Sequence, residues 1–264
     1  MGITESIKYG FSYATSDYQK LLIFGIICIL ASLSSVVIGF GIKNNESLFA
    51  VTGIIAFIFS IVVGGYRLSV LKKNIEGESD LPDLNIKDNF IDGIKLIVLE
   101  IVYYLIPAII TIIIAVITLG ASIASLGGEA LNSTANETAL LNPALLGTFL
   151  TGFAIVIIVG IILFIIFAFF EFMGASRLAK TGSLSEGLSF KQSYADAKSI
   201  GFGPLLGWII LVGIIIFIIT LIGSLITLIP YVGALITALI ITPFIAIFTS
   251  ASLGNLYKTD VLKE

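Results

Sequence analysis

The chain has 264 residues, of which 58% are hydrophobic and only 12% charged, and its mean hydropathy is +1.12. Soluble globular chains carry roughly a quarter charged residues, so this composition excludes an ordinary water-soluble fold. A net charge of −3 offers no basic face for nucleic acid. The sequence has no histidine and a single cysteine, Cys28, which excludes Ser-His-Asp catalysis, the usual zinc sites and an internal disulfide.

Six apolar stretches are long enough to cross a bilayer, which takes about 20 mostly apolar residues. In chain order they cover residues 21–42, 47–68, 94–119, 144–173, 203–229 and 231–253. The uncharged run over 199–257 is too long for one crossing, so we place a break at Pro230. We therefore predict an all-α, polytopic bundle of six transmembrane helices that forms one integral membrane domain over 1–264.

The cations are sorted between the two sides of this arrangement. Thirteen of the fourteen Lys and Arg residues fall on one side of the six predicted spans, and only Lys43 falls on the other. Since cytoplasmic loops carry the excess of Lys and Arg, we predict a plasma membrane protein with both termini in the cytoplasm.

A short motif ends the second and fourth spans, and a degraded form of it ends the sixth. The three copies cover residues 64–68, 174–178 and 252–256, with Arg67, Arg177 and Asn255 at the same position. A half-polar segment precedes each pair of spans, at residues 3–19, 88–95 and 184–200, and such segments suit helices in the membrane interface. This pattern favours three repeats of interfacial helix, outward span and return span; alternatively, small residues and cations simply recur at span ends.

The connection between the second and third spans contains the most distinctive sequence motifs of the chain. It contains Gly65-Tyr66-Arg67, then Leu81-Pro82-Asp83, then Phe90-Ile91-Asp92-Gly93-Ile94-Lys95. In these motifs the chain resembles an uncharacterised family of archaeal, largely methanogen, membrane proteins, domain of unknown function 4013. The resemblance implies an archaeal membrane protein over nearly the whole length, and it implies no activity.

Two acids lie within predicted spans, where ionisable groups are costly and often functional. Glu100 and Glu171 fall at comparable depth near the cytoplasmic border, where Arg67 and Arg177 also lie. We predict a polar cluster of these four residues. It would form a proton, cation or anion site, or else a structural ion pair that locks helices together.

A second candidate feature is a cavity lined by a polar, proline-containing helix face. Tyr104, Pro107 and Thr111 share one face of the third span by their spacing, and Pro243 is expected to kink the sixth span in the same way as Pro107. The alternative is an ordinary helix-packing face.

The loop between the third and fourth spans holds two glycosylation sequons, at Asn132 and Asn136. The acidic loop over 76–92 matches no metal-binding motif and is typical of a solvated surface. We predict no catalytic residue, no metal and no cofactor.

Three classes of function stay open. The first is a membrane scaffold or accessory subunit, with membrane lipids and an unidentified membrane protein or a second copy as partners. The second is a transporter or channel that uses the level of Glu100 and Glu171. The third and weakest is an intramembrane lipid-handling enzyme, because no nucleophile–base pair is visible in the sequence.

Overall fold

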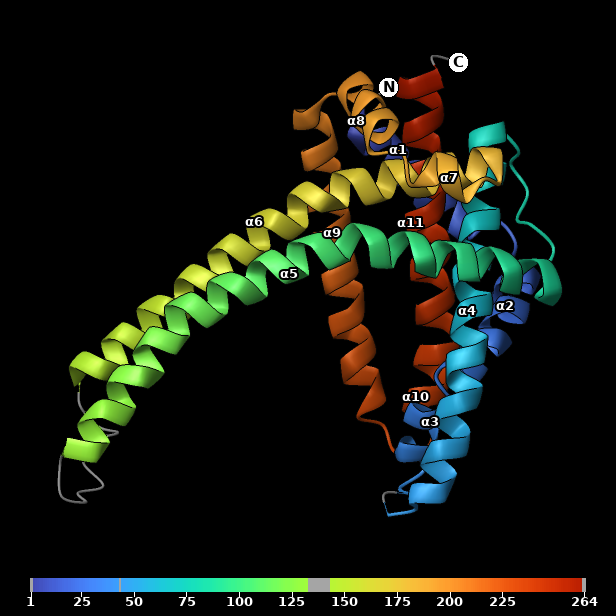
Figure 1. The fold of residues 1–264 in the computed structure, drawn as a ribbon. Helices are drawn as coiled ribbons and strands as arrows, with labels where there is room; N and C mark the ends of the chain where they lie inside the picture. The colour runs from blue at the N-terminus through green and yellow to red at the C-terminus, as the bar shows by residue number, and fades with distance from the viewer. Residues whose placement is uncertain (1, 43, 133–142, 263–264) are drawn as a thin grey trace. The chain divides into compact units, whose positions relative to one another are not determined.

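The computed structural model describes residues 2–42, 44–132 and 143–262, and these residues fold as helices joined by short connections (Figure 1). The elements are α1 (Ile3–Ala14), α2 (Tyr18–Ala31), α3 (Leu33–Gly39), α4 (Glu46–Glu76), α5 (Ile86–Asn132), α6 (Pro143–Thr181), α7 (Leu184–Gly187), α8 (Phe190–Ile200), α9 (Phe202–Thr227), α10 (Gly233–Ile236), the π-helix η2 (Thr237–Ile241), α11 (Thr242–Tyr257) and the π-helix η3 (Lys258–Leu262). The predicted all-α class is confirmed.

Within the described residues, five helical stretches are long and apolar enough to cross a membrane. They are Glu46–Glu76, Ile86–Gly120, Gly147–Thr181, Phe202–Thr227 and Gly233–Leu262. A sixth crossing results only if α1 and α2 are counted together, and these two helices meet at an angle of 84°. The chain is therefore a membrane-embedded protein with five to six helices that could span the bilayer.

The first predicted span, residues 21–42, is two helices in the structure. Helix α2 ends at Ala31, where Ser32 leaves helical geometry with φ −108° and ψ 17°, and α3 continues from Leu33 to Gly39. A polar contact lies beside the break, because the Ser34 hydroxyl donates to the Thr52 hydroxyl of α4 over 3.3 Å. Serines stand at positions 32, 34 and 35, and serine hydroxyls compete with a helix for its backbone groups. An uncharged run that looks like one span therefore contains a helix boundary.

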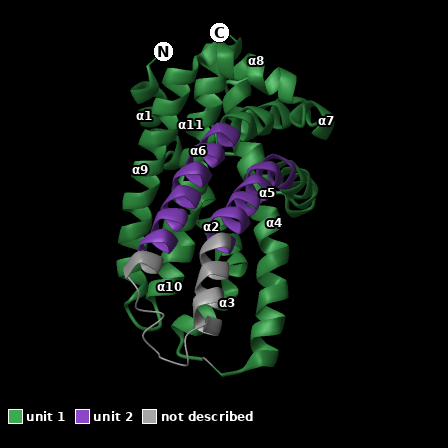
Figure 2. Ribbon diagram, turned by 60° about the vertical axis from the view of Figure 1, so that its left-hand side comes forward, with its two compact units in different colours: residues 1–99, 169–264 green, residues 100–168 purple. Residues whose placement is uncertain are grey.

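The helices form two compact units (Figure 2). The first unit comprises residues 1–99 and 169–264, and the second comprises residues 100–168. The second unit is the helical pair formed by most of α5 and α6. The prediction of one membrane domain stays a prediction.

Glycines allow unusually close helix crossings in the first unit. A Cβ atom added at Gly65 of α4 would overlap the carbonyl oxygen of Asn89 in α5, and one added at Gly93 of α5 would overlap the carbonyl oxygen of Ile61 in α4. The same holds for Gly25 of α2 against the backbone of η2. Backbones can approach this closely only where a side chain is missing, and small residues mark such interfaces in membrane bundles.

Each predicted interfacial segment packs against the end of a return helix. Helix α1 lies on α11, where the Ser6 hydroxyl donates to Asn255 Oδ1 over 3.1 Å. The first turns of α5 lie on α4, where the Asn89 amide donates to the Ser69 hydroxyl over 3.3 Å.

The third such contact lies between α8 and α6, through a bond of 2.9 Å from Arg177 to Asp196. All three segments place a buried Ser or Asn four residues before a buried Gly or Ala: Ser6 and Gly10, Asn89 and Gly93, Ser193 and Ala197. The three segments share this spacing, while the threefold repeat itself stays a prediction. One expectation about these segments is wrong. Residues 88–95 are not a separate interfacial helix, because they form the first turns of α5.

Pro243 lies in the first turn of α11, directly after the π-helix η2. Proline has no N–H to donate, which frees a carbonyl one turn earlier. The local chain bonds differently there, since the Thr242 hydroxyl donates to the carbonyl of Thr237 over 3.2 Å. The irregularity expected at Pro243 therefore takes the form of a π-helical turn.

Candidate functional site

The connection between α4 and α5 is fixed by three side chains from elsewhere in the first unit. Tyr13, Lys20 and Tyr66 donate hydrogen bonds to three consecutive carbonyl oxygens of residues 80–82, in that order, over 2.7, 2.7 and 3.0 Å. Each donor takes one carbonyl of a segment that belongs to neither a helix nor a strand. Because buried carbonyls need partners, these bonds allow the segment to pack against the bundle.

Local sequence signals bring the donors to this place. Helix α4 ends at Glu76 and is capped by Gly77, whose φ of 83° is a left-handed conformation that glycine adopts at no steric cost. The carboxylate of Asp17 caps α2 by accepting the backbone N–H of Lys20 over 3.0 Å. This cap starts α2 directly after the bend from α1, so that Tyr13 and Lys20 lie on either side of the bend.

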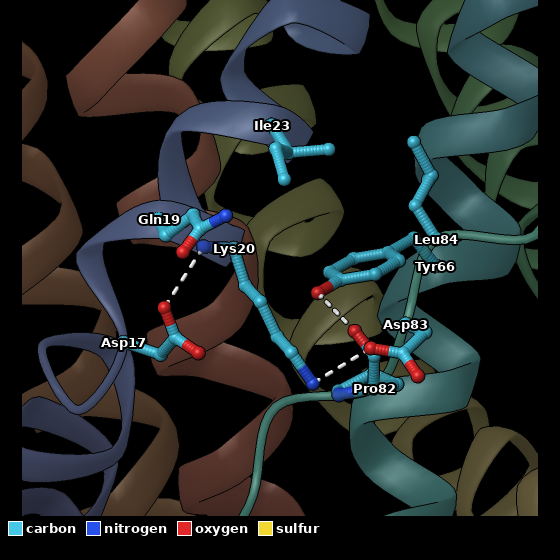
Figure 3. A pocket seen from close by; sticks show the side chains of 8 residues that line it. All are labelled: Asp17, Gln19, Lys20, Ile23, Tyr66, Pro82, Asp83 and Leu84. Carbon is cyan, nitrogen blue, oxygen red and sulfur yellow. Dashed lines mark hydrogen bonds and ion pairs between the residues drawn. The ribbon is translucent and has the colours of Figure 1, made fainter.

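A cavity of about 230 Å³ opens beside this connection (Figure 3). Its lining consists of Asp17, Gln19, Lys20, Ile23, Tyr66, Pro82, Asp83 and Leu84. Lys20 Nζ lies 2.7 Å from the Asp83 carboxylate, and the two side chains are 30% and 91% exposed. The hydrogen bond from the lysine holds the pKa of Asp83 below its usual value. The cavity thus combines one cation, two carboxylates and an apolar wall.

A second polar network surrounds Arg177 near the end of α6. Its guanidinium donates to Asp196 over 2.9 Å and to Glu186 over 3.0 Å, and also to the side chain of Gln192. The Tyr257 hydroxyl donates to the same Asp196 oxygen over 2.8 Å. The arginine and Asp196 side chains are only 19% and 11% exposed. This network joins α6, α7, α8 and α11 into one body.

The predicted polar cluster is divided among different surroundings. Arg67 and Glu171 line one small cavity of about 20 Å³, together with residues of α5 and α11, and Glu171 is 4% exposed. Arg177 instead contacts the acids of α7 and α8. Glu100 belongs to the second unit. The structure therefore brings two of the four predicted residues to one cavity.

The residues predicted to line a polar cavity lie in helix contacts. Within the second unit, the Tyr104 ring stacks on Phe164 of α6 at 5.9 Å, and Thr111 donates to the carbonyl of Pro107 over 2.7 Å. Pro107 lies inside α5, which continues through it as one helix. Pro243 is buried in the first unit. Whether this helix face lines a cavity or only packs against its neighbours stays open, and the cavity stays a prediction.

The predicted glycosylation sites stay predictions. Asn132 is the last residue of α5, and Asn136 lies outside the described residues.

Sequence reasoning misses most of the polar residues that the structure gathers. It groups Lys20 with the other cytoplasmic cations and singles out none of Tyr13, Asp196 and Tyr257. A usable signal exists only for Asp196, an acid on the otherwise small or apolar face of a short helix. The others depend on contacts between segments that lie 61 or 67 residues apart, which no local pattern records.

The sequence profile of the family described as protein of unknown function (DUF4013) matches residues 48–228. The chain therefore belongs to this family of uncharacterised proteins. The match includes the α4–α5 connection and the Arg177 network apart from Tyr257. No curated protein and no solved structure matches the chain.

Proposed function

We propose that this protein is a multi-pass membrane scaffold or accessory subunit of an archaeal plasma membrane, with both termini in the cytoplasm. The observation that carries the proposal is the packed surroundings of Arg67 and Glu171. The cavity that these two residues line has a volume of only about 20 Å³. One water needs roughly 10–15 Å³ measured in this way, and small-molecule sites take about 300–1,000 Å³. The space suits one water and no transported solute.

The helix contacts of the first unit support the same proposal. At Gly65, Gly93 and Gly25 the backbones of neighbouring helices are in contact, so these helices cannot approach one another more closely. Alternating access requires one part of a bundle to rock against another. Close backbone contact and the buried Arg177 network favour a rigid body that presents fixed surfaces to a partner.

The charged end of the first unit offers such a surface. Exposed lysines lie on the segments that the charge distribution assigns to the cytoplasm, namely Lys72, Lys87, Lys180, Lys191 and Lys198. Exposed acids lie on the same segments, among them Glu76, Glu78 and Asp88. Partners that bind there are therefore expected to carry side chains of both signs at matching positions, since charge complementarity fixes register and excludes other partners.

Amine-reactive cross-linking in native membranes, read by mass spectrometry, tests this function. We expect lysines of the charged end to link to a second polypeptide in a complex that survives native electrophoresis. The matched variant Lys191→Arg/Lys198→Arg keeps both charges but lacks reactive amines, so it should keep the complex and lose those links. Links confined to a single chain, together with migration as a monomer, would contradict a scaffold.

Transport is the second candidate, favoured by one observation. Glu171 is an acid that lies within a candidate span and is only 4% exposed. Ionisable residues inside membrane spans are functional-site candidates by default. A transport role requires ion flux in proteoliposomes that Glu171→Gln removes without lowering thermal stability. Equal flux in the variant and wild type would show that Glu171 has no role in transport.

A further inference from the structure

We propose that the cavity beside the α4–α5 connection binds the headgroup of a phospholipid that carries a primary amine, of the phosphoethanolamine type. This inference goes beyond the scaffold function and does not depend on it. It rests on the position of the cavity, on its paired charges and on its size (Figure 3).

The cavity lies where a polar helix end meets an apolar, outward-facing helix surface. Lys20 and Asp17 belong to the first turn and cap of α2. The following residues of the same helix expose apolar side chains, with Leu22 43%, Ile23 42% and Ile26 55% exposed. In a membrane-embedded chain such side chains face acyl chains, and the charged end lies at headgroup level. A lipid headgroup is thus the ligand that reaches this cavity at the highest local concentration.

Lys20 supplies the contact for the phosphate. Its ammonium is held in place by the carbonyl of Leu81 at 2.7 Å, independently of its ion pair with Asp83. An ion pair to a carboxylate that is 91% exposed contributes little to stability. A phosphate oxygen can therefore replace Asp83 as the partner of Lys20 without displacing the lysine from its carbonyl.

Two carboxylates supply the contact for the amine. Asp83, once released by Lys20, and Asp17 both line the cavity. An ionised carboxylate has about four lone-pair sites, so Asp17 can accept from an ammonium while it caps α2. The headgroup's positive and negative ends then meet opposite charges, and the exchange leaves no charge of the cavity without a partner.

The volume fits a headgroup rather than a whole amphiphile. At about 230 Å³ the cavity is smaller than the roughly 300–1,000 Å³ of drug-sized ligand sites. Ile23 and Leu84 form its apolar wall, along which the acyl chains can leave toward the outward face of α2. Choline headgroups have no N–H to donate, and phosphoglycerol headgroups have no cation, so both should bind more weakly.

Native mass spectrometry of the full chain in detergent tests the proposal. The protein is titrated with short-chain phosphatidylethanolamine, phosphatidylcholine and phosphatidylglycerol, and with soluble O-phosphoethanolamine. We expect phosphatidylethanolamine to be retained about fivefold more than the other lipids, as expected for about one additional charge-assisted contact. Retention of all three lipids in equal amounts would overturn the proposal, and so would soluble phosphoethanolamine that binds as tightly as the lipid.

Variants separate this cavity from other lipid contacts. Lys20→Met should reduce phosphatidylethanolamine retention to the level of the other lipids. Asp83→Asn changes an exposed side chain, so it leaves folding intact even if Lys20→Met does not, and it should remove the preference over phosphatidylglycerol. Lys73→Met is the matched control, because Lys73 forms an ion pair with Glu78 near the same connection but does not line the cavity. A preference that survives Asp83→Asn, or one that Lys73→Met lowers equally, would overturn the assignment.

Discussion

Lys20 and Arg177 perform the same structural task in two different environments. Each is a cation of the first unit that ties a connecting segment to the helices, and each pairs with an aspartate. The Arg177 and Asp196 side chains are 19% and 11% exposed, whereas those of Lys20 and Asp83 are 30% and 91% exposed. Burial decides what each pair can do. The buried network can only hold helices together, whereas the exposed aspartate can give up its partner to a ligand.

The largest expected effect comes from breaking the buried network. Arg177→Met leaves Asp196 without its cation, so that only the Tyr257 hydroxyl still donates a hydrogen bond to this carboxylate. Breaking a fully buried ion pair costs about 3–5 kcal/mol. Because this pair is still 19% and 11% exposed, the free energy of unfolding should fall by an amount near the lower end of that range in an SDS titration. Lys95→Met is the control, since its pair with Asp92 is more exposed, at 32% and 40%, and its loss should cost about 1 kcal/mol or less. Equal losses in both variants would show that burial does not distinguish the two kinds of pair.

The next effect concerns the helix crossing that supports the Lys20 cavity. Gly65→Ala would drive a methyl group into the Asn89 carbonyl of α5. Overpacking of this kind costs about 1–3 kcal/mol, and the thermal midpoint should fall accordingly. At the adjacent Gly64 the nearest side-chain atom to an added Cβ is Leu96 Cδ2 at 3.6 Å, an ordinary contact. Gly64→Ala should therefore be close to wild type, and a reversed order of the two alanine variants would refute this crossing.

A smaller effect is expected where a hydroxyl holds the α4–α5 connection. Tyr66→Phe removes the hydrogen bond to the carbonyl of Pro82 and leaves a buried acceptor without its partner, which costs about 1–3 kcal/mol. The loss should lie near the lower limit, because the ring still stacks on Phe24. Tyr18→Phe, at a side chain 67% exposed, should leave stability unchanged. Chemical denaturation that gives the two variants equal stability would argue against the bond.

The smallest effect is a pH dependence at the exposed pair. Lys20 lowers the pKa of Asp83 in the folded state, so the pair stabilises the fold fully above the ordinary aspartate pKa of about 3.9. That contribution is lost as the pH falls through the lowered pKa. Wild type should thus be slightly more stable than Asp83→Asn above about pH 5, and the difference should begin to shrink near pH 4 and vanish only below the lowered pKa of Asp83. A difference that grows on acidification would have the wrong sign for this pair.

The sequence predicts the parts of the fold that depend on hydropathy and helix-breaking residues. The length of each apolar run determines the helical class, and Pro230 marks a real turn between α9 and α10. The break at Ser32 is not predicted because residues 21–42 carry no charge, and the serines at positions 32, 34 and 35 are too few to end the apolar run. The continuity of residues 88–95 with α5 is likewise invisible, since a polar first turn looks the same as a separate interfacial helix.

The polar sites are less predictable for a different physical reason. Arg177 stands out because arginine is rare in this chain, but its partners lie on α7 and α8, and Tyr257 of α11 joins the network only through Asp196. Lys20 pairs with a carbonyl and an aspartate more than 60 residues away. Charge counting assigns such residues to a side of the membrane, whereas their partners are decided by how the helices cross.

Proton flux into proteoliposomes under an imposed potential tests the central claim that this protein is a packed scaffold rather than a transporter or channel. Wild-type protein should give the flux of protein-free vesicles, and Glu171→Gln should give the same value, because the cavity at Glu171 has room for about one water and so for no chain of waters that could pass protons on. Flux well above that background, abolished by Glu171→Gln at unchanged thermal stability, would contradict the account.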